Sequence, residues 1–341
     1  MVSSMTSALG RVGRALRLAL LVAAVGLVAG AMGAATGGAR AQAQYPVHPV
    51  RVILPFAAGG VADITARLVA DKLSEKFGQR FFIENQPGAG GITAARSVIS
   101  GGPDGYTLAL LTNGTAISVP LFEHLPFNPL KDFTPISTIG TFSCVFVTSG
   151  ASSYRTLGDV LKAARAKPGA LNLGSIIVGS TQNLTAQLFR SMSGADMVIV
   201  PFRTSPDEVV ALLRGDVQMA VDFYAALKPA LDSGKARPVA TSGPQRSPEL
   251  PDVPTAREAG VPGFDVTSWN ALYAPAGTPE AIIETLNAAL HEILQDPELK
   301  KRALELGIDA KASTAAEVDA RMRGDIEKWA KVIAETGVPK Q

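Results

Sequence analysis

Short apolar runs alternate with amphipathic stretches along most of the chain. Residues 50–56, 81–83 and 107–111 are rich in β-branched and apolar side chains and predict three strands. Between them, residues 63–77 predict a helix with apolar side chains at Ile64, Leu68 and Leu73, and residues 91–100 predict a shorter one. A βαβαβ rhythm is typical of parallel strands joined by helical crossovers.

The same rhythm returns in the second half of the chain. Strands are predicted at residues 142–148, 171–174, 198–201 and 217–221, and helices at 156–166, 181–192 and 205–214. The tail is mostly helical, with predicted helices at 280–295, 298–306 and 315–334. Two α/β lobes follow from this repetition.

Two segments, residues 136–149 and 266–275, are suited to carry the chain between the lobes. We therefore expect lobe 1 to comprise residues 45–142 and 270–341, and lobe 2 residues 143–269. Two crossings form a hinge, and a cleft between hinged lobes is a common place for a small ligand.

The first 41 residues differ from the rest. Arginines 11, 14 and 17 precede an apolar run at 18–35, which is followed by Ala39-Arg40-Ala41, a cleavage site with small residues. These three features occur in the same order in secretory signal peptides. The competing interpretation is a membrane anchor, because about 18 apolar residues approach the length that spans a bilayer. The Gly- and Ala-rich composition and the Ala-Arg-Ala site favour a cleaved signal at residues 1–41 and export to a bacterial periplasm.

Composition excludes several classes of function. Without the signal peptide, which holds four arginines and no acids, 28 basic residues face 30 acidic ones, and no basic patch alternates with aromatics as nucleic-acid binding requires. The single cysteine, Cys144, predicts a buried thiol and no internal disulfide, which suits the periplasm. No histidine has a partner at metal-ligand spacing and no Gly-x-Ser-x-Gly is present, so neither a metal, a cofactor nor an enzyme is indicated.

A glycine turn after the first strand is the strongest local feature. "PFAAGGVADITARLVADKL" (55–73) lacks both the Walker lysine and Gly-x-Gly-x-x-Gly. Gly59 and Gly60 allow a ligand to approach the backbone, and the helix start favours an anion, with Asp63 as the predicted N-cap. An ordinary βα turn explains the glycines equally well.

The second lobe repeats this arrangement in "GSIIVGSTQNLTAQLF" (174–189). Gly179 provides the turn, and Ser175, Ser180 and Thr181 add hydroxyl groups. Two such helix starts, one in each lobe, are able to hold a dianion between them, and this pairing favours a binding function over two ordinary turns.

Several motifs, in one order along the whole predicted mature chain, resemble the tripartite tricarboxylate transporter substrate-binding family, the Bug-type periplasmic binding proteins. They are "LPFAAGGVADITARLVADKL" (54–73), "ENQPGAGGITAA" (84–95), "PDGYTLALLTNG" (103–114), "FNPLKDFTPIS" (127–137), "KPGALNLGS" (167–175), "VPFR" (200–203), "LLRGDVQMAVD" (212–222), "LPDVPTAREAGVPGF" (250–264) and "APAGTP" (274–279).

The resemblance implies a two-lobed venus-flytrap fold of type II-like architecture. It also implies a carboxylate ligand, contacted by both turns and bridged by waters, and delivery to membrane permease subunits. We expect the protein to be a monomer. Two alternative functions stay open, a ligand-sensing subunit of a membrane signalling protein and an enzyme evolved in the same cleft. The motifs imply ligand contacts by Phe56, Gly59, Gly60, Val61, Ala62, Asp63, Gly179, Ser180 and Thr181. The full predicted site adds Asn113, Ser175, Phe202, Arg203 and Asp222.

The chain departs from the family pattern at two places near the expected site. Phe202-Arg203-Thr204-Ser205 replaces a tyrosine-containing, glycine-containing sequence, and Gln182-Asn183 stands where histidine is frequent. Both departures put the identity of the ligand in doubt. Asp222 is a candidate partner for an ammonium group, if the ligand is an amino acid.

Overall fold

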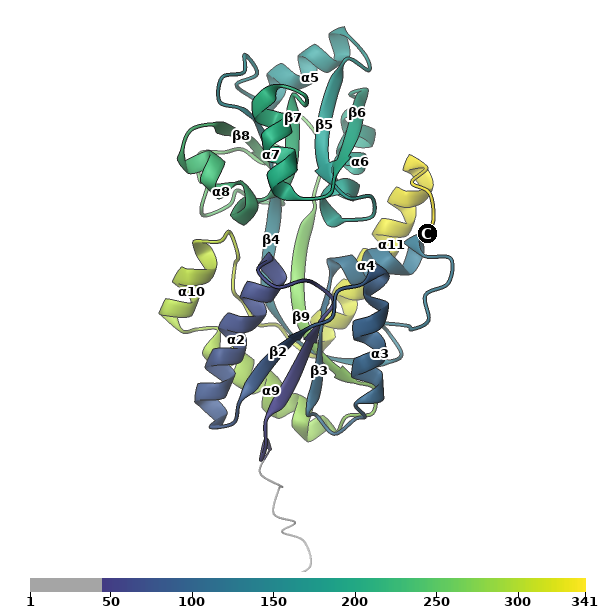
Figure 1. The fold of residues 1–341 in the computed structure, drawn as a ribbon, viewed down its shortest axis with the longest axis vertical. Coiled ribbons are helices and arrows are strands. Elements are labelled where there is room, and N and C mark those ends of the chain that lie inside the picture. Colours follow the sequence, from purple (N-terminus) through teal and green to yellow (C-terminus); the bar gives the residue numbers. More distant parts are fainter. Residues whose placement is uncertain (1–44) are drawn as a thin grey trace, which may run out of the picture. The chain divides into compact units, whose positions relative to one another are not determined.

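The structure is a computed structural model of the chain that describes residues 45–341 (Figure 1). The predicted signal peptide, residues 1–41, lies outside the described residues. All described helices and strands belong to one unit, residues 46–341. Within this part of the chain, no helix has the length and apolar character needed to cross a membrane.

Lobe 1 begins with the predicted βαβαβ unit. Its elements are β1 (Val50–Leu54), α2 (Val61–Phe77), β2 (Phe81–Asn85), the 3-10 turn η1 (Ala89–Gly91), α3 (Ile92–Ser100), β3 (Thr107–Thr112) and α4 (Asn113–Leu121). β1 lies between β2 and β3 and pairs in parallel with both. Ile64, Leu68 and Leu73 were predicted to form the apolar face of α2, but only Leu73 is fully buried. The rest of the apolar buried face consists of Ala66, Val69 and Ala70.

Helix α4 was not predicted. Its sequence contains Asn113-Gly114, a turn signal, and Pro120, which interrupts helical hydrogen bonding. The helix forms because Thr112 caps it in a capping box with Thr115, and because most of its side chains are buried in the core.

The two predicted crossing segments are long paired strands, β4 (Phe133–Ser149) and β9 (Thr267–Pro275). They pair antiparallel over most of β9, and β3 lies on the other side of β9. After Ser143, which pairs with Thr267, β4 changes partner, so that Cys144 pairs with Phe223 of β7. The sheet order is therefore β2-β1-β3-β9-β4-β7-β5-β6, with β8 also paired to β4.

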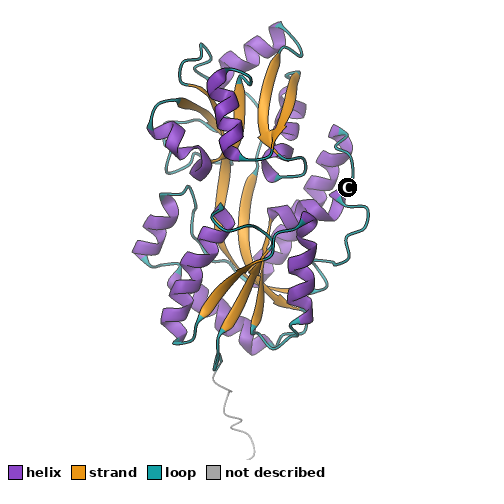
Figure 2. Cartoon of the chain, viewed as in Figure 1, coloured by secondary structure: helices purple, strands orange, loops and turns teal. Residues whose placement is uncertain are grey.

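Lobe 2 contains the predicted strands and helices in order, with a further helix at Tyr224–Asp232 and a further strand at Ala236–Thr241 that were not predicted. Its elements are α5 (Leu157–Ala166), β5 (Leu171–Ile176), α6 (Thr181–Ser193), β6 (Met197–Phe202), α7 (Ser205–Arg214), β7 (Met219–Phe223), α8 (Tyr224–Asp232) and β8 (Ala236–Thr241). β5 pairs in parallel with β6 and β7, and helices flank the strands (Figure 2). Each of these strands therefore ends at a turn that leads into a helix.

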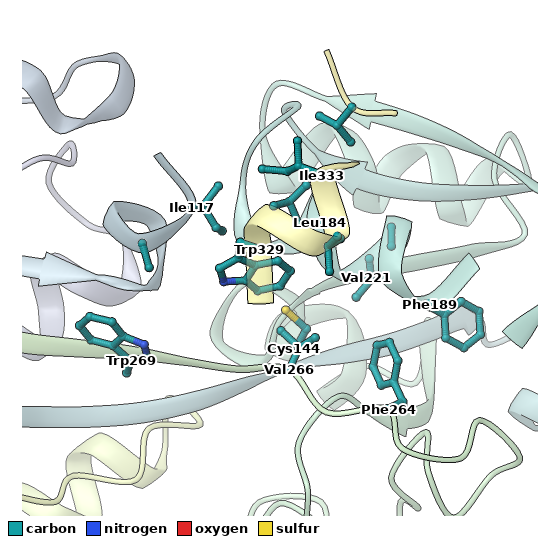
Figure 3. Packing of buried hydrophobic residues seen from close by; sticks show 14 of the residues in the cluster. Ile117, Cys144, Leu184, Phe189, Val221, Phe264, Val266, Trp269, Trp329 and Ile333 are labelled. Atoms are coloured by element: carbon teal, nitrogen blue, oxygen red, sulfur yellow. The ribbon is translucent and has the colours of Figure 1, made fainter. Parts of the chain in front are cut away.

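The C-terminal tail adds three helices, α9 (Glu280–Ile293), α10 (Pro297–Leu304) and α11 (Ala315–Thr336). α11 packs against α4 of lobe 1 and α6 of lobe 2. Trp329 and Ile333 of α11 belong to one buried cluster with Ile117 of α4 and Leu184 of α6 (Figure 3). The last helix of the chain thus contributes to the hydrophobic core of both lobes.

Candidate functional site

The turn between β1 and α2 presents backbone donors at a helix start. α2 begins at Val61, with Gly60 as an N-cap that makes no side-chain hydrogen bond. Gly59 has φ +88°, which glycine adopts without strain. The backbone N–H groups of Val61 and Ala62 have no hydrogen-bond partner within residues 45–341. They are free donors at the positive end of the helix dipole.

Asp63 does not cap α2, contrary to the prediction. It lies inside the first turn of the helix, where its carboxylate accepts hydrogen bonds from Gly59 N–H (2.9 Å), Arg67 Nε (2.9 Å) and Asn85 Nδ2 (2.9 Å). Burial raises the pKa of Asp63, but these three donors outweigh burial and the pKa lies below its ordinary value. Asn85 also donates to the carbonyl of Phe56. The hydrogen bonds of Asp63 and Asn85 therefore stabilise the conformation of the turn.

The turn between β5 and α6 has the same form. Ser180 is the N-cap of α6, and its hydroxyl accepts from Asn183 N–H at 3.1 Å. Gly179 has φ +84°. The N–H groups of Thr181 and Gln182 have no hydrogen-bond partner in the described part of the chain. Ser180 is thus held by its own helix, which leaves these two amides as donors.

A hydrogen bond joins the start of α4 in lobe 1 to the start of α6 in lobe 2. Asn113, at the start of α4, is fully buried and donates from Nδ2 to Thr181 Oγ1 (3.0 Å), while its Oδ1 accepts from Trp329 Nε1 (2.8 Å). The exposed ring of Phe56 lies over the adjacent Gly114, with 3.9 Å between its Cζ and a Cβ built on that glycine. A Cβ built on Gly179 would lie 2.5 Å from Leu121 Cδ2, so the lobes also meet at this glycine.

The remaining predicted residues divide into buried and exposed ones. Ser175 is fully buried on β5, where its hydroxyl accepts from Asn183 Nδ2 at 3.0 Å. Phe202 ends β6 and pairs with Ile176, the last residue of β5. Arg203 follows it on the surface, with no ion pair to any described residue. Ser175 therefore supports the turn from inside, and Arg203 supplies a free positive charge beyond β6.

Asp222 is buried at the end of β7. Its Oδ1 accepts from Gln182 Nε2 (2.9 Å) and from Phe223 N–H (2.7 Å), and its Oδ2 has no well-aligned partner, although the Ser205 hydroxyl favours its charged form. Burial raises its pKa. In this conformation the Asp222 carboxylate is not accessible to a ligand ammonium group.

Glu208, which the sequence did not indicate, is a second buried carboxyl group beside Asp222. It is 0% exposed on α7, and neither of its oxygens has a well-aligned hydrogen bond. Burial and then the charge of Asp222 raise its pKa to about 9, and Val221 N–H offsets only part of this. Gly174 makes room for it, since a Cβ there would lie 3.2 Å from Glu208 Cγ.

Four further residues that shape this region were missed. Asn85, Gln182 and Trp329 each donate a side-chain hydrogen bond to a predicted site residue, and Glu208 lies beside Asp222. Gln182-Asn183 stood out as a departure from the family pattern, whereas nothing local marks Trp329. No group of three or more His, Cys, Asp or Glu side chains suited to a metal ion occurs within residues 45–341.

Two α/β lobes joined by paired crossing strands, each with a helix start that leaves backbone N–H groups free after a glycine turn, define a two-lobed binding protein. Residues 65–338 match the family model described as the tripartite tricarboxylate transporter family receptor. The chain belongs to this receptor family.

Known relatives agree with this assignment. Protein BugT of Bordetella pertussis (strain Tohama I) is 32% identical over 295 residues, which cover 86% of this chain and 90% of BugT. The solved structure of R. palustris Rpa4515 with adipate superposes with a TM-score of 0.78 at 32% identity, covering 87% of this chain and all of that one. MatC (Rpa3494) from Rhodopseudomonas palustris with bound malate gives a TM-score of 0.71 at 33% identity, covering 85% and 100%.

Proposed function

We propose that the protein captures a small carboxylate between its two lobes in the periplasm and delivers it to the membrane subunits of a tripartite tricarboxylate transporter. One observation carries the proposal. The helix starts of α2 and α6 each leave two backbone N–H groups without a protein partner, and the Asn113–Thr181 hydrogen bond joins the lobes beside α6.

Helix starts suit carboxylates because free N–H groups and the helix dipole both favour negative charge. The adipate and malate held by the two related structures support this class of ligand. Arg203, which has no ion pair in the described chain, is positioned after β6 to add charge to a ligand held at the second turn. The proposed binding residues are therefore those of the two turns, with Phe202 and Arg203 beside the second turn. Asn113, whose Nδ2 and Oδ1 both have protein partners, joins the lobes rather than contacting the ligand.

Asp63, Ser175 and Asp222 take an indirect role in this proposal. Their side-chain polar atoms are buried or committed to protein partners, so they hold the turns rather than touch the ligand. The proposal includes a monomeric receptor rather than an enzyme; membership of the receptor family supports the receptor role, and incubation with adipate or malate is expected to return the acid unchanged.

The experiment is calorimetric titration of the signal-free protein with a panel of carboxylates that includes adipate and malate. Gly60→Val is the decisive variant. Gly60 has φ −81° and ψ 169°, and a Cβ there meets nothing within 4 Å, so valine fits the fold but fills the approach to the free amides. We expect binding to fall sharply. Gly324→Val on α11, which also meets nothing within 4 Å, is the matched control and should bind like the parent.

A second variant gives a graded effect. Ser180→Ala removes the helix cap and one hydroxyl, and should weaken binding by about 1 kcal/mol. Small-angle scattering should show a smaller radius of gyration at saturating ligand, because a ligand that touches both lobes favours their closure. Unchanged affinity in Gly60→Val would place the ligand elsewhere.

A further inference from the structure

Gln182 lies in the first turn of α6. Its side-chain amide nitrogen is hydrogen-bonded to the protein, and its carbonyl oxygen has no partner in the described chain. It follows Thr181, whose hydroxyl contacts Asn113 of lobe 1, so its amide lies beside the interlobe contact. Gln182 Nε2 donates to Asp222 Oδ1 at 2.9 Å. Its Oε1 is not buried and accepts no hydrogen bond from residues 45–341.

Asp222 fixes which end of the amide is free. Asp222 Oδ1 already accepts the N–H of Phe223 at 2.7 Å, so this oxygen acts as an acceptor and requires a donor from Gln182. The amide nitrogen must therefore face Asp222, and the carbonyl oxygen must face away. This holds whether or not a proton sits on Oδ2, because Oδ1 accepts in both states.

The two carboxyl groups next to this amide are buried. Asp222 and Glu208 are both 0% exposed, and Glu208 fills the space that Gly174 leaves over β5. A ligand ammonium group therefore finds no accessible carboxylate here, since Asp222 Oδ1 is saturated and Oδ2 is buried. The accessible group here is the carbonyl oxygen of Gln182, a neutral hydrogen-bond acceptor.

We propose that the carbonyl oxygen of Gln182 accepts a hydrogen bond from a hydroxyl group of the ligand, and that the protein prefers 2-hydroxy carboxylates to their deoxy analogues. The inference rests on the proposed function. In this proposal the free N–H groups of Thr181 and Gln182 hold the carboxylate, and its C2 substituent lies next to the Gln182 side chain. Apolar Ile177 and Val178, 53% and 37% exposed in the same turn, are available to the remainder of the ligand.

The test compares matched acids by calorimetry: malate against succinate, and 2-hydroxyadipate against adipate. We expect the parent to bind the hydroxy acid of at least one pair about five- to tenfold more tightly, the effect of one net hydrogen bond. Gln182→Met keeps the length of the side chain without the acceptor, so the ratio of hydroxy-acid to deoxy-acid affinity should fall to within about twofold, whatever the change does to the affinity for the deoxy acid itself. Gln187→Met, the same change further along α6, is the matched control and should keep the preference.

Asp222 is a positioning residue in this proposal and has its own test. Asp222→Asn keeps an oxygen that accepts from Phe223 and Gln182, and should keep the preference. Asp222→Ala releases the amide and should lose it, even where the deoxy acid still binds. The proposal is overturned if hydroxy and deoxy acids bind the parent equally, if Gln182→Met retains the preference, or if aspartate binds more tightly than malate. Failure of every carboxylate to bind would instead overturn the proposed function, and the preference for hydroxy acids with it.

Discussion

The buried carboxyl group of Glu208 should make the folded state less stable as the pH rises. Its pKa is raised from an ordinary 4.5 to about 9 by burial and by Asp222. Between these two values the unfolded chain releases a proton that the folded protein keeps. Each pH unit in this window therefore lowers the free energy of unfolding by about 1.4 kcal/mol, and stability that is fully present below pH 4.5 is lost as the pH rises towards 9.

From pH 5 to pH 8 this amounts to about 4 kcal/mol, a large share of the roughly 5–15 kcal/mol that stabilises a typical protein. Glu208→Gln removes the titration while keeping the size of the side chain. At pH 5 the variant should lie within about 1 kcal/mol of the parent, since both side chains are neutral and poorly hydrogen-bonded. At pH 8 the variant should be the more stable protein. Ionisation of Glu208 in the unfolded parent lowers the parent's free energy of unfolding, and glutamine has no such ionisation.

The assay is urea unfolding at pH 5, 6.5 and 8, followed by circular dichroism. Glu284→Gln, the same change at an exposed position on α9, is the control and should run parallel to the parent. The raised pKa of Asp222 adds a slope of the same sign to all three proteins, so the parent-minus-variant difference reports the titration of Glu208 together with its coupling to Asp222. A difference that stays constant from pH 5 to pH 8 would refute the shifted titration.

Three further changes test the contacts around the turns. Gly179→Ala, at φ +84° and 2.5 Å from Leu121 Cδ2, should lower the free energy of unfolding by about 1–3 kcal/mol; combined with Leu121→Ala in urea unfolding, the loss should be smaller than the sum of the two single losses. Trp329→Phe leaves Asn113 Oδ1 unpaired in a buried site and should cost about 1–3 kcal/mol by the same assay, and no loss would deny this bond a structural role. Asp63→Asn should cost about 1 kcal/mol at pH 7, a small value because Arg67 is half exposed. Because the folded pKa of Asp63 is lowered, this contribution is present above pH 3.8 and disappears on acidification below it, so the two acid-unfolding curves should converge there.

The repeated strand–helix order and the positions of both glycine turns are predictable from the chain alone. Apolar periodicity and glycine are local signals, since β5 and α6 form largely from the residues within them and Gly179 takes a conformation that other residues avoid. The run of motifs likewise identified the receptor family, which the match over residues 65–338 shows.

Local signals failed where packing overrode them. α4 contains Asn113-Gly114 and Pro120, which predict a turn, yet it forms because the capping box and burial stabilise it. Of the two crossing segments, only residues 142–148 were predicted as a strand. The structure makes both segments long paired strands of one continuous sheet, β9 with β4 and then β4 with β7. Strand pairing depends on residues distant in sequence, so a single segment does not reveal it.

Which side chains contact one another depends on how the elements pack in three dimensions. Asn113 contacts Thr181 across 68 positions of sequence and Trp329 across 216. Asp222 appeared to be a possible ligand contact, but folding buried it beneath Gln182 and beside Glu208, so its charge acts on protein groups. Such hydrogen bonds depend on direction and distance within a packed core, and these are set by how helices and strands pack together rather than by the order of residues within any one of them.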